Sequence, residues 1–239
     1  MVTVVNPGNP TGVSLSKDLL QSIVDLCREY NVWLILDCTY EYFTTPTGHQ
    51  PLATFPDEEH VIHIFSFSKS YAMAGYRCGY LVMHPSHTEV WQNMLKVQDT
   101  LPIGPPRISQ WAAIGALQAG SDWVYHQYQT LDSSRQAMTQ VLNDCLEETM
   151  GGTGAMYLMG KLPGGGDVDE SSQDDEVLDV AVARRLVKDF GVAVIPGSFC
   201  GFSGWIRVCY ANLPPEQCAV AAERLREGLE TIFSKNSSS

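Results

Sequence analysis

Short apolar runs alternate with helical patterns along the amino-terminal third of the chain. The runs at residues 2–5, 32–37, 61–65 and 79–84 predict β-strands, because they are rich in β-branched and aromatic side chains. The second and third runs are almost continuously apolar, which favours strands buried on both faces. A helical pattern separates the first two runs. This order predicts β-α-β units around a mostly parallel sheet.

The segment SKDLLQSIVDLCREY predicts an amphipathic helix that begins after Ser16. A serine at this position can accept a hydrogen bond from the first helical turn. The apolar residues that recur at helical spacing, and are therefore expected on the buried face, are Leu19, Leu20, Ile23, Val24 and Cys27.

The rest of the chain predicts further helices and a second, smaller sheet. Residues 88–119 have a helical pattern that the prolines of LPIGPPR interrupt, and residues 122–150 predict one long helix. The later expected elements are a glycine-punctuated strand, a helix at 178–190, strands at 192–196 and 205–210, and a helix at 215–233. The sequence thus predicts an α/β fold, with a first domain at 1–124 and a smaller α+β domain at 125–239.

The net charge of the chain indicates which kinds of binding partner are to be expected. The formal net charge of −12 argues against a nucleic-acid or anionic-membrane surface, because either would require basic patches. We therefore expect neither partner. Part of the acidity lies in one stretch, which we expect to be a solvated loop and which contains Asp167, Asp169, Glu170, Asp174, Asp175, Glu176 and Asp179.

The seven cysteines include no Cys-x-x-Cys pair and no cluster with histidine at metal-ligand spacing. They predict neither a disulfide framework nor a metal site, and they fit a reducing compartment. No apolar run approaches the length of a membrane span, and we expect no leader peptide, because Met1 is followed directly by the strand pattern VTVV.

Polar and reactive residues follow two of the predicted buried strands. Asp37 ends the run VWLILD, and Lys69 follows VIHIF within the segment SFSKSYAMAGYRCGY. The carboxyl ends of parallel strands meet at one edge of a sheet, so we expect both side chains there, with Arg77 near the base of the next strand. The loop NPGNPTG follows the first strand and is expected at the same edge.

This set of groups indicates a site for an anionic, pyridine-containing aldehyde. A lysine amine can form an imine with an aldehyde, while an acid and a guanidinium can bind the ring nitrogen and an anionic group. Taken singly, Asp37 also fits a helix cap, Tyr40 a packed ring and Lys69 an exposed loop lysine. The interpretation therefore depends on their joint arrangement.

The segments NPGNPTG, LDCTYEYF, SFSKSYAMAGYRCGY and GWIRVCYA resemble, in their order and separations, the class I aminotransferases of the fold-type I pyridoxal-phosphate enzymes. The residues of these segments are most similar to those of the subgroup that acts on aspartate, aromatic amino acids, methionine or kynurenine. The resemblance implies that residues 1–124 are the carboxyl-terminal part of the large, cofactor-binding domain and that residues 125–239 are the small domain. It also implies pyridoxal 5'-phosphate as cofactor, an amino acid and a 2-oxo acid as substrates, and a homodimer.

The resemblance implies a role for each matching residue. Lys69 resembles the lysine that forms the imine and then shuttles a proton, and Asp37 resembles the acid that keeps the pyridine nitrogen protonated. Tyr40 and Asn9 resemble the residues that hydrogen-bond to the ring oxygen of the cofactor, and the resemblance implies that Tyr40 is also a catalytic residue. Arg207 resembles the arginine that binds the substrate carboxylate, with Asn9 beside the substrate. The implied phosphate ligands are Ser66, Arg77 and, more weakly, Ser68.

Other conspicuous residues are predicted to be structural. His63 alternates within an apolar strand and is expected in the core, and Trp33, Trp111 and Trp123 are expected to pack on apolar faces.

Chains of this family extend much further at the amino end, so we expect the sequence to match only their carboxyl-terminal part. The sheet is then expected to expose an edge and apolar faces, and transferase activity is expected to be impaired or absent. Two alternatives stay open: a carbon–sulfur lyase of the same fold, and a non-catalytic fragment that serves interaction or dimerisation. We expect a cytoplasmic location, with an organelle as the open alternative for a longer precursor.

Overall fold

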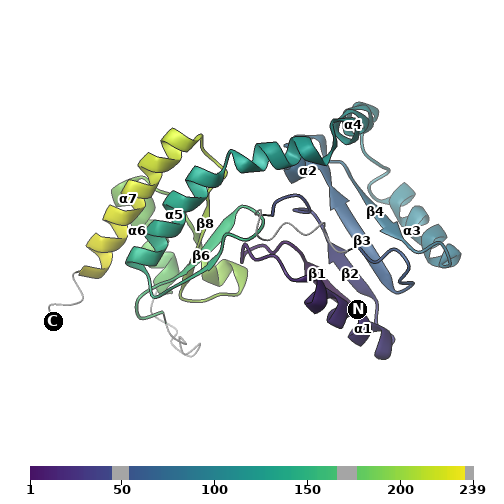
Figure 1. The fold of residues 1–239 in the computed structure, drawn as a ribbon, viewed down its shortest axis with the longest axis horizontal. Coiled ribbons are helices and arrows are strands. Elements are labelled where there is room, and N and C mark those ends of the chain that lie inside the picture. The colour runs from purple at the N-terminus through teal and green to yellow at the C-terminus, as the bar shows by residue number, and fades with distance from the viewer. Residues whose placement is uncertain (45–53, 166–176, 235–239) are drawn as a thin grey trace. The chain divides into compact units, whose positions relative to one another are not determined.

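The computed structural model describes residues 1–44, 54–165 and 177–234, and the chain divides into two compact units (Figure 1). The first unit comprises Met1–Gly8 and Ser14–Tyr128, and the second comprises Asn9–Val13 and Gln129–Ser239. The short segment Asn9–Val13 therefore groups with the later part of the chain, which the sequence pattern did not indicate.

The first unit is built on a four-stranded sheet of order β1-β2-β3-β4. The first three strands are parallel and β4 is antiparallel to β3, so the predicted mostly parallel sheet is confirmed. The elements of this unit are β1 (Val2–Val5), α1 (Lys17–Glu29), β2 (Leu34–Asp37), β3 (Val61–Ser66), α2 (Phe67–Ser70), a 3-10 turn (Ala74–Tyr76), β4 (Gly79–Met83), α3 (Thr88–Thr100) and α4 (Arg107–Gln129).

Helix α1 covers one face of this sheet. Ser16 caps the helix as predicted, its Oγ accepting from the backbone N–H of Leu19 at 3.2 Å. Leu20, Val24 and Cys27 are buried against the sheet, but Leu19 is 47% exposed and does not belong to the buried face.

The opposite face of the sheet is only partly covered. Ile35 and Ile62 are half-buried and Ile64 is 36% exposed. The prediction that strands β2 and β3 are buried on both faces is therefore wrong for the described residues, because α1 packs on one side only. His63 points to the covered face, is 3% exposed and accepts from Phe55 N–H at 3.2 Å, as expected of a core histidine.

The second unit is a four-stranded antiparallel sheet of order β5-β6-β8-β7 with helices on one face. Side chains of α5, α6 and α7 form its core together with β6 and β8, and the three helices lie together in Figure 1. The elements are α5 (Asp132–Cys145), β5 (Glu148–Gly151), β6 (Tyr157–Lys161), α6 (Leu178–Phe190), β7 (Ile195–Pro196), a 3-10 turn (Gly197–Cys200), β8 (Trp205–Cys209) and α7 (Pro215–Ser234).

The predicted single helix at 122–150 is wrong. Helix α4 is kinked at Gly120, whose φ is 79°, and continues to Gln129, and α5 then ends at Cys145. Leu146 takes an extended backbone, and the following residues pair with β6 as a strand. Pairing within the sheet therefore outweighs the helical propensity of this stretch.

Asp179 corrects the expectation of a solvated acidic loop. It lies in the first turn of α6, is fully buried, and accepts from Ser198 N–H at 2.7 Å and from Ser198 Oγ at 3.0 Å. The other six acidic residues of that stretch lie outside the described residues. Trp111 and Trp123 are further corrections, because 63% and 42% of them are exposed, although the Trp123 ring stacks on Tyr71.

Candidate active site

Asp37 stands at the carboxyl end of β2. It pairs in register with Ile64 of β3, and Cys38 N–H donates to the Ile64 carbonyl at 2.8 Å. Its Oδ1 accepts from Thr39 N–H at 3.0 Å and from Thr39 Oγ1 at 2.6 Å, which fixes the orientation of the carboxyl group. Among the described residues nothing bonds to its Oδ2, so one carboxylate oxygen is available to a ligand.

Lys69 stands at the carboxyl end of the neighbouring strand. Strand β3 ends at Ser66, whose Oγ accepts from Ser68 N–H at 3.1 Å and so starts the short helix α2 that holds Lys69. Within the described part of the chain, the Lys69 amine has no hydrogen bond or ion pair. Since β2 and β3 are adjacent and parallel, Asp37 and Lys69 lie at the same edge of the sheet, as predicted.

Arg77 lies at this edge as well. It precedes β4, whose Gly79 pairs with Ser66, and a Cβ on Gly79 would come within 2.7 Å of the Phe65 carbonyl. Arg77 adopts a left-handed φ of 51° and donates to the Ala74 carbonyl at 2.8 Å. Arg77 lines an open pocket of about 380 Å³ together with Tyr76 and Pro106.

Tyr40 and its neighbour Glu41 occupy the buried side of this edge. Tyr40 is 4% exposed and contacts Phe43 edge-on, with ring centroids 6.1 Å apart. Burial raises the pKa of Glu41 to about 7. Burial, and after it the Glu41 charge, raises the pKa of both Tyr42 and Tyr80 to about 12.

The second unit brings Asn9 and Arg207 together. Arg207, on β8, donates from one terminal nitrogen to Asn9 Oδ1 at 2.9 Å, and its guanidinium carbon lies 4.6 Å from the centroid of the Tyr157 ring. The Arg207 Nε is buried and has no hydrogen-bond partner among the residues that the structure describes. A buried donor without a partner is costly, so the guanidinium is prepared for an acceptor such as a carboxylate.

Gly12 fixes the loop that carries Asn9. Its φ is +67°, and its carbonyl accepts from Thr153 N–H at 3.2 Å and Gly154 N–H at 3.0 Å. A Cβ at this position would collide with the Tyr157 carbonyl, so only glycine fits.

Polar groups of the first unit fit parts of a pyridoxal phosphate molecule, and one group of the second unit fits a substrate carboxylate. The free Asp37 Oδ2 suits a protonated ring nitrogen, and the serine and arginine groups at residues 66 and 77 suit a phosphate. The unpaired Arg207 Nε suits a substrate carboxylate. No group of three or more His, Cys, Asp or Glu side chains in the described ranges is arranged to hold a metal ion.

Three contributors to the site were not found from the sequence. Thr39 anchors Asp37, Tyr157 supports the Arg207 guanidinium, and Glu41 is a half-buried carboxyl group beside the predicted tyrosine. Thr39 and Glu41 lie inside the motif LDCTYEYF, but nothing in the pattern distinguishes their side chains. Tyr157 reads as an ordinary strand residue.

Comparisons with known proteins agree with the predicted resemblance. A family model described as aminotransferase class I and II matches residues 1–225. The aromatic aminotransferase ISS1 of Arabidopsis thaliana is 37% identical over 234 residues, which cover 98% of this chain and 56% of that protein. An aspartate aminotransferase of Pyrococcus horikoshii is 28% identical, and the match covers 96% of this chain and 56% of that protein.

Solved structures agree with the predicted α/β class. An aromatic aminotransferase from Pyrococcus horikoshii matches with a TM-score of 0.81 and 29% identity over 96% of this chain and 60% of that chain. An aspartate aminotransferase from Thermotoga maritima matches with a TM-score of 0.78 and 25% identity over 95% of this chain and 56% of that chain. The chain thus spans a little over half the length of the curated relatives it matches.

Proposed function

Because the chain belongs to the aminotransferase class I and II family, we propose that the protein moves an amino group between an amino acid and a 2-oxo acid, with pyridoxal 5'-phosphate as cofactor. The observation that supports this most is the position of Asp37 and Lys69 at the carboxyl ends of adjacent parallel strands. Residues 1–124 then form the cofactor-binding part and residues 125–239 the small domain.

When bound, pyridoxal phosphate supplies an aldehyde that exchanges amines and a ring that withdraws electrons from the α-carbon. Asp37 holds the proton on the ring nitrogen through its free Oδ2, while Thr39 keeps the carboxyl group oriented. Tyr40 and Asn9 donate to the ring oxygen. Ser66, Ser68 and Arg77 bind the phosphate, the arginine through its planar fork.

Lys69 carries the proton in this scheme. With the cofactor bound, its amine would take the proton from the substrate α-carbon and deliver it to the cofactor carbon that carried the aldehyde, which is general acid–base catalysis by a single positioned group. A lysine that already had an ion pair would serve poorly, and no partner of Lys69 exists among the described residues. Tyr40 would stabilise negative charge on the ring oxygen of the bound cofactor by donating a hydrogen bond to it.

Arg207 binds the substrate α-carboxylate. Two features support this role: a buried Nε without a partner, and a guanidinium plane held over the Tyr157 ring. Asn9 orients the guanidinium by accepting one N–H, which leaves the rest of the fork for the carboxylate.

The identity of one relative suggests the substrate to test first. The Arabidopsis protein at 37% identity is named an aromatic aminotransferase, so we propose an aromatic amino acid as amino donor, with aspartate as the second choice. The chain's seven free cysteines support a reducing, cytoplasmic location, and no described helix is long and apolar enough to cross a membrane. We also propose a homodimer, as the family resemblance implies.

Transfer assays test the proposal. The purified chain is incubated with pyridoxal phosphate, 2-oxoglutarate and tyrosine, phenylalanine or aspartate, and glutamate formation is measured. Lys69→Ala should abolish the product, whereas Lys96→Ala, which removes a surface lysine of α3, should not. Pyruvate and ammonia from cysteine without an acceptor would instead indicate a carbon–sulfur lyase. No turnover of any donor would mean that these 239 residues do not carry the activity by themselves.

A further inference from the structure

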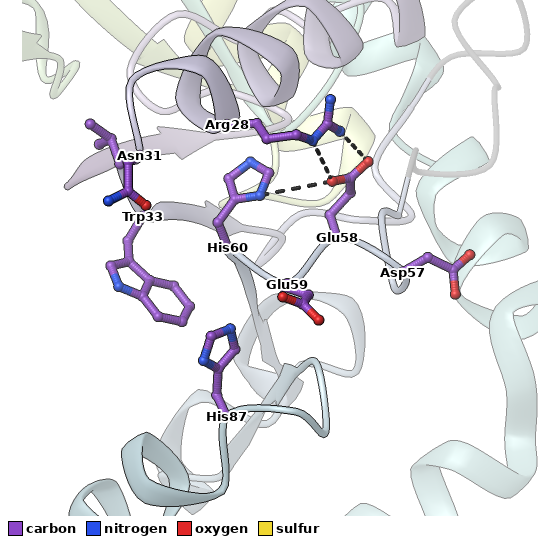
Figure 2. Close-up of a pocket in the computed structure, with 9 residues that line it drawn as sticks. Arg28, Asn31, Trp33, Asp57, Glu58, Glu59, His60 and His87 are labelled. Carbon is purple, nitrogen blue, oxygen red and sulfur yellow. Dashed lines mark hydrogen bonds and ion pairs between the residues drawn. The ribbon is translucent and has the colours of Figure 1, made fainter.

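A second pocket lies at the other end of the first sheet from Asp37 and Lys69 (Figure 2). Trp33 directly precedes β2 and His60 directly precedes β3, so the pocket opens at the amino ends of these strands. Its volume is about 430 Å³, within the size range of small-molecule sites. The proposed aminotransferase site makes no use of these residues.

Some charges of this pocket already have partners. Arg28 donates from Nε to Glu58 Oε2 at 3.1 Å and from a terminal nitrogen to the other Glu58 oxygen, forming a bidentate pair. His60 bonds through Nε2 to the Val24 carbonyl at 3.0 Å, and its Nδ1 lies 3.8 Å from the Glu58 carboxylate. These contacts hold Arg28, Glu58 and His60 together along one side of the pocket, and Figure 2 draws those made by Glu58.

Two carboxylates of the lining remain available. Glu59 is 64% exposed at its side chain, and its only ion-pair contact in the described residues is His84 Nδ1 at 3.8 Å. No described residue forms an ion pair with Asp57. The lining holds one arginine, Arg28, beside the three carboxylates of Asp57, Glu58 and Glu59, so it keeps an excess of negative charge.

An aromatic wall faces Glu59. The rings of Trp33 and His87 meet edge-on with centroids 4.8 Å apart, and Figure 2 shows Glu59 and the two rings around the same space. In the described ranges His87 Nε2 is buried and has no hydrogen-bond partner, so its ring contact with Trp33 is the interaction that holds this side chain. An indole face beside a carboxylate is a favourable environment for an organic cation.

We propose that this pocket binds a small organic ammonium ion, with its charge on Glu59 and its apolar body against Trp33. A metal ion is a poorer fit, because no three His, Cys, Asp or Glu side chains of the described residues converge as metal ligands. An anion is a poorer fit as well, because Arg28 is already paired with Glu58 and Asp25.

The probe for this site is benzylammonium, compared with benzyl alcohol and phenylacetate, which have similar bodies but are neutral and anionic. Binding is followed by NMR, through the signals of the added ligand in every variant and through the indole N–H signals of the protein, and the Trp33 signal is assigned as the one missing from Trp33→Leu. We expect saturable binding of benzylammonium alone, centred on the Trp33 signal and weakened by salt.

Matched variants locate the binding. Glu59→Gln should weaken benzylammonium about threefold and Trp33→Leu about fivefold, as for an exposed ion pair and a cation–π contact. The exposed α3 controls Glu89→Gln and Trp91→Leu should leave the affinity unchanged. Because Glu59 is exposed, its variant should fold even if Trp33→Leu does not. The proposal is overturned by equal binding of benzyl alcohol, by unchanged affinity of Glu59→Gln, or by no binding of benzylammonium.

Discussion

Glu41→Gln should stabilise the first unit, and should do so much more at alkaline pH than at acid pH. Burial, the main cause, raises the pKa of Glu41 in the folded chain to about 7, against an ordinary value of 4.5. The folded state therefore favours the neutral carboxyl group. Glutamine has nearly the same shape and carries no charge at any pH, so the substitution removes only the ionisation.

The sign and size follow from proton linkage. Below the unfolded pKa both states bind the proton and the folded carboxyl group carries no ionisation penalty. As the pH rises through the folded pKa, the folded state must ionise a buried group, and stability is lost. The difference between pKa values of 4.5 and about 7 corresponds to a loss of about 3 kcal/mol above pH 8. At pH 5 the corresponding loss is less than about 1 kcal/mol.

Urea unfolding at pH 5 and pH 8.5, followed by tryptophan fluorescence, measures this difference. The probe suits the first unit, because Trp33, Trp91, Trp111 and Trp123 belong to it and only Trp205 does not. Glu29→Gln, which alters an exposed carboxylate at the end of α1, is the control. A stability gain from Glu41→Gln that is the same at both pH values would refute the reasoning.

Three further predictions concern the second unit. Asp179→Ala removes the acceptor of two Ser198 hydrogen bonds and should lower the free energy of unfolding by about 2 kcal/mol or more, measured through Trp205 fluorescence. Gly12→Ala should cost at least about 1 kcal/mol, because alanine disfavours a φ of +67° and its Cβ meets the Tyr157 carbonyl; an unchanged urea midpoint would contradict this. Arg207→Lys keeps the charge but loses the fork, so amino-acid binding measured by absorbance titration of the cofactor-loaded protein should weaken about tenfold.

The site edge of the first sheet was predictable because its signals are local and strong. The apolar runs that end at Asp37 and before Ser66 identify adjacent buried strands, and parallel pairing then places Lys69 beside Asp37. The Ser16 cap and the helix after it follow from the same kind of local pattern.

The failures have a common physical cause, which is that burial depends on partners distant in the sequence. Leu19 fits the apolar period but lies beyond the area that the sheet covers, and Asp179 has an acidic context but meets Ser198 of a later turn. Glu148–Gly151 has a helical composition and becomes a strand because β6 is there to pair with it. Tyr157 and Glu41 acquire their environments only in the folded chain.

The most direct test of the central claim is to trap the cofactor on Lys69. The chain is incubated with pyridoxal phosphate, reduced with borohydride and analysed by peptide mass spectrometry, with Lys69→Ala and Lys96→Ala treated in parallel. The account predicts one dominant adduct on Lys69 that Lys69→Ala abolishes and Lys96→Ala leaves intact. A single specific adduct on another lysine, or one that persists in Lys69→Ala, would contradict it.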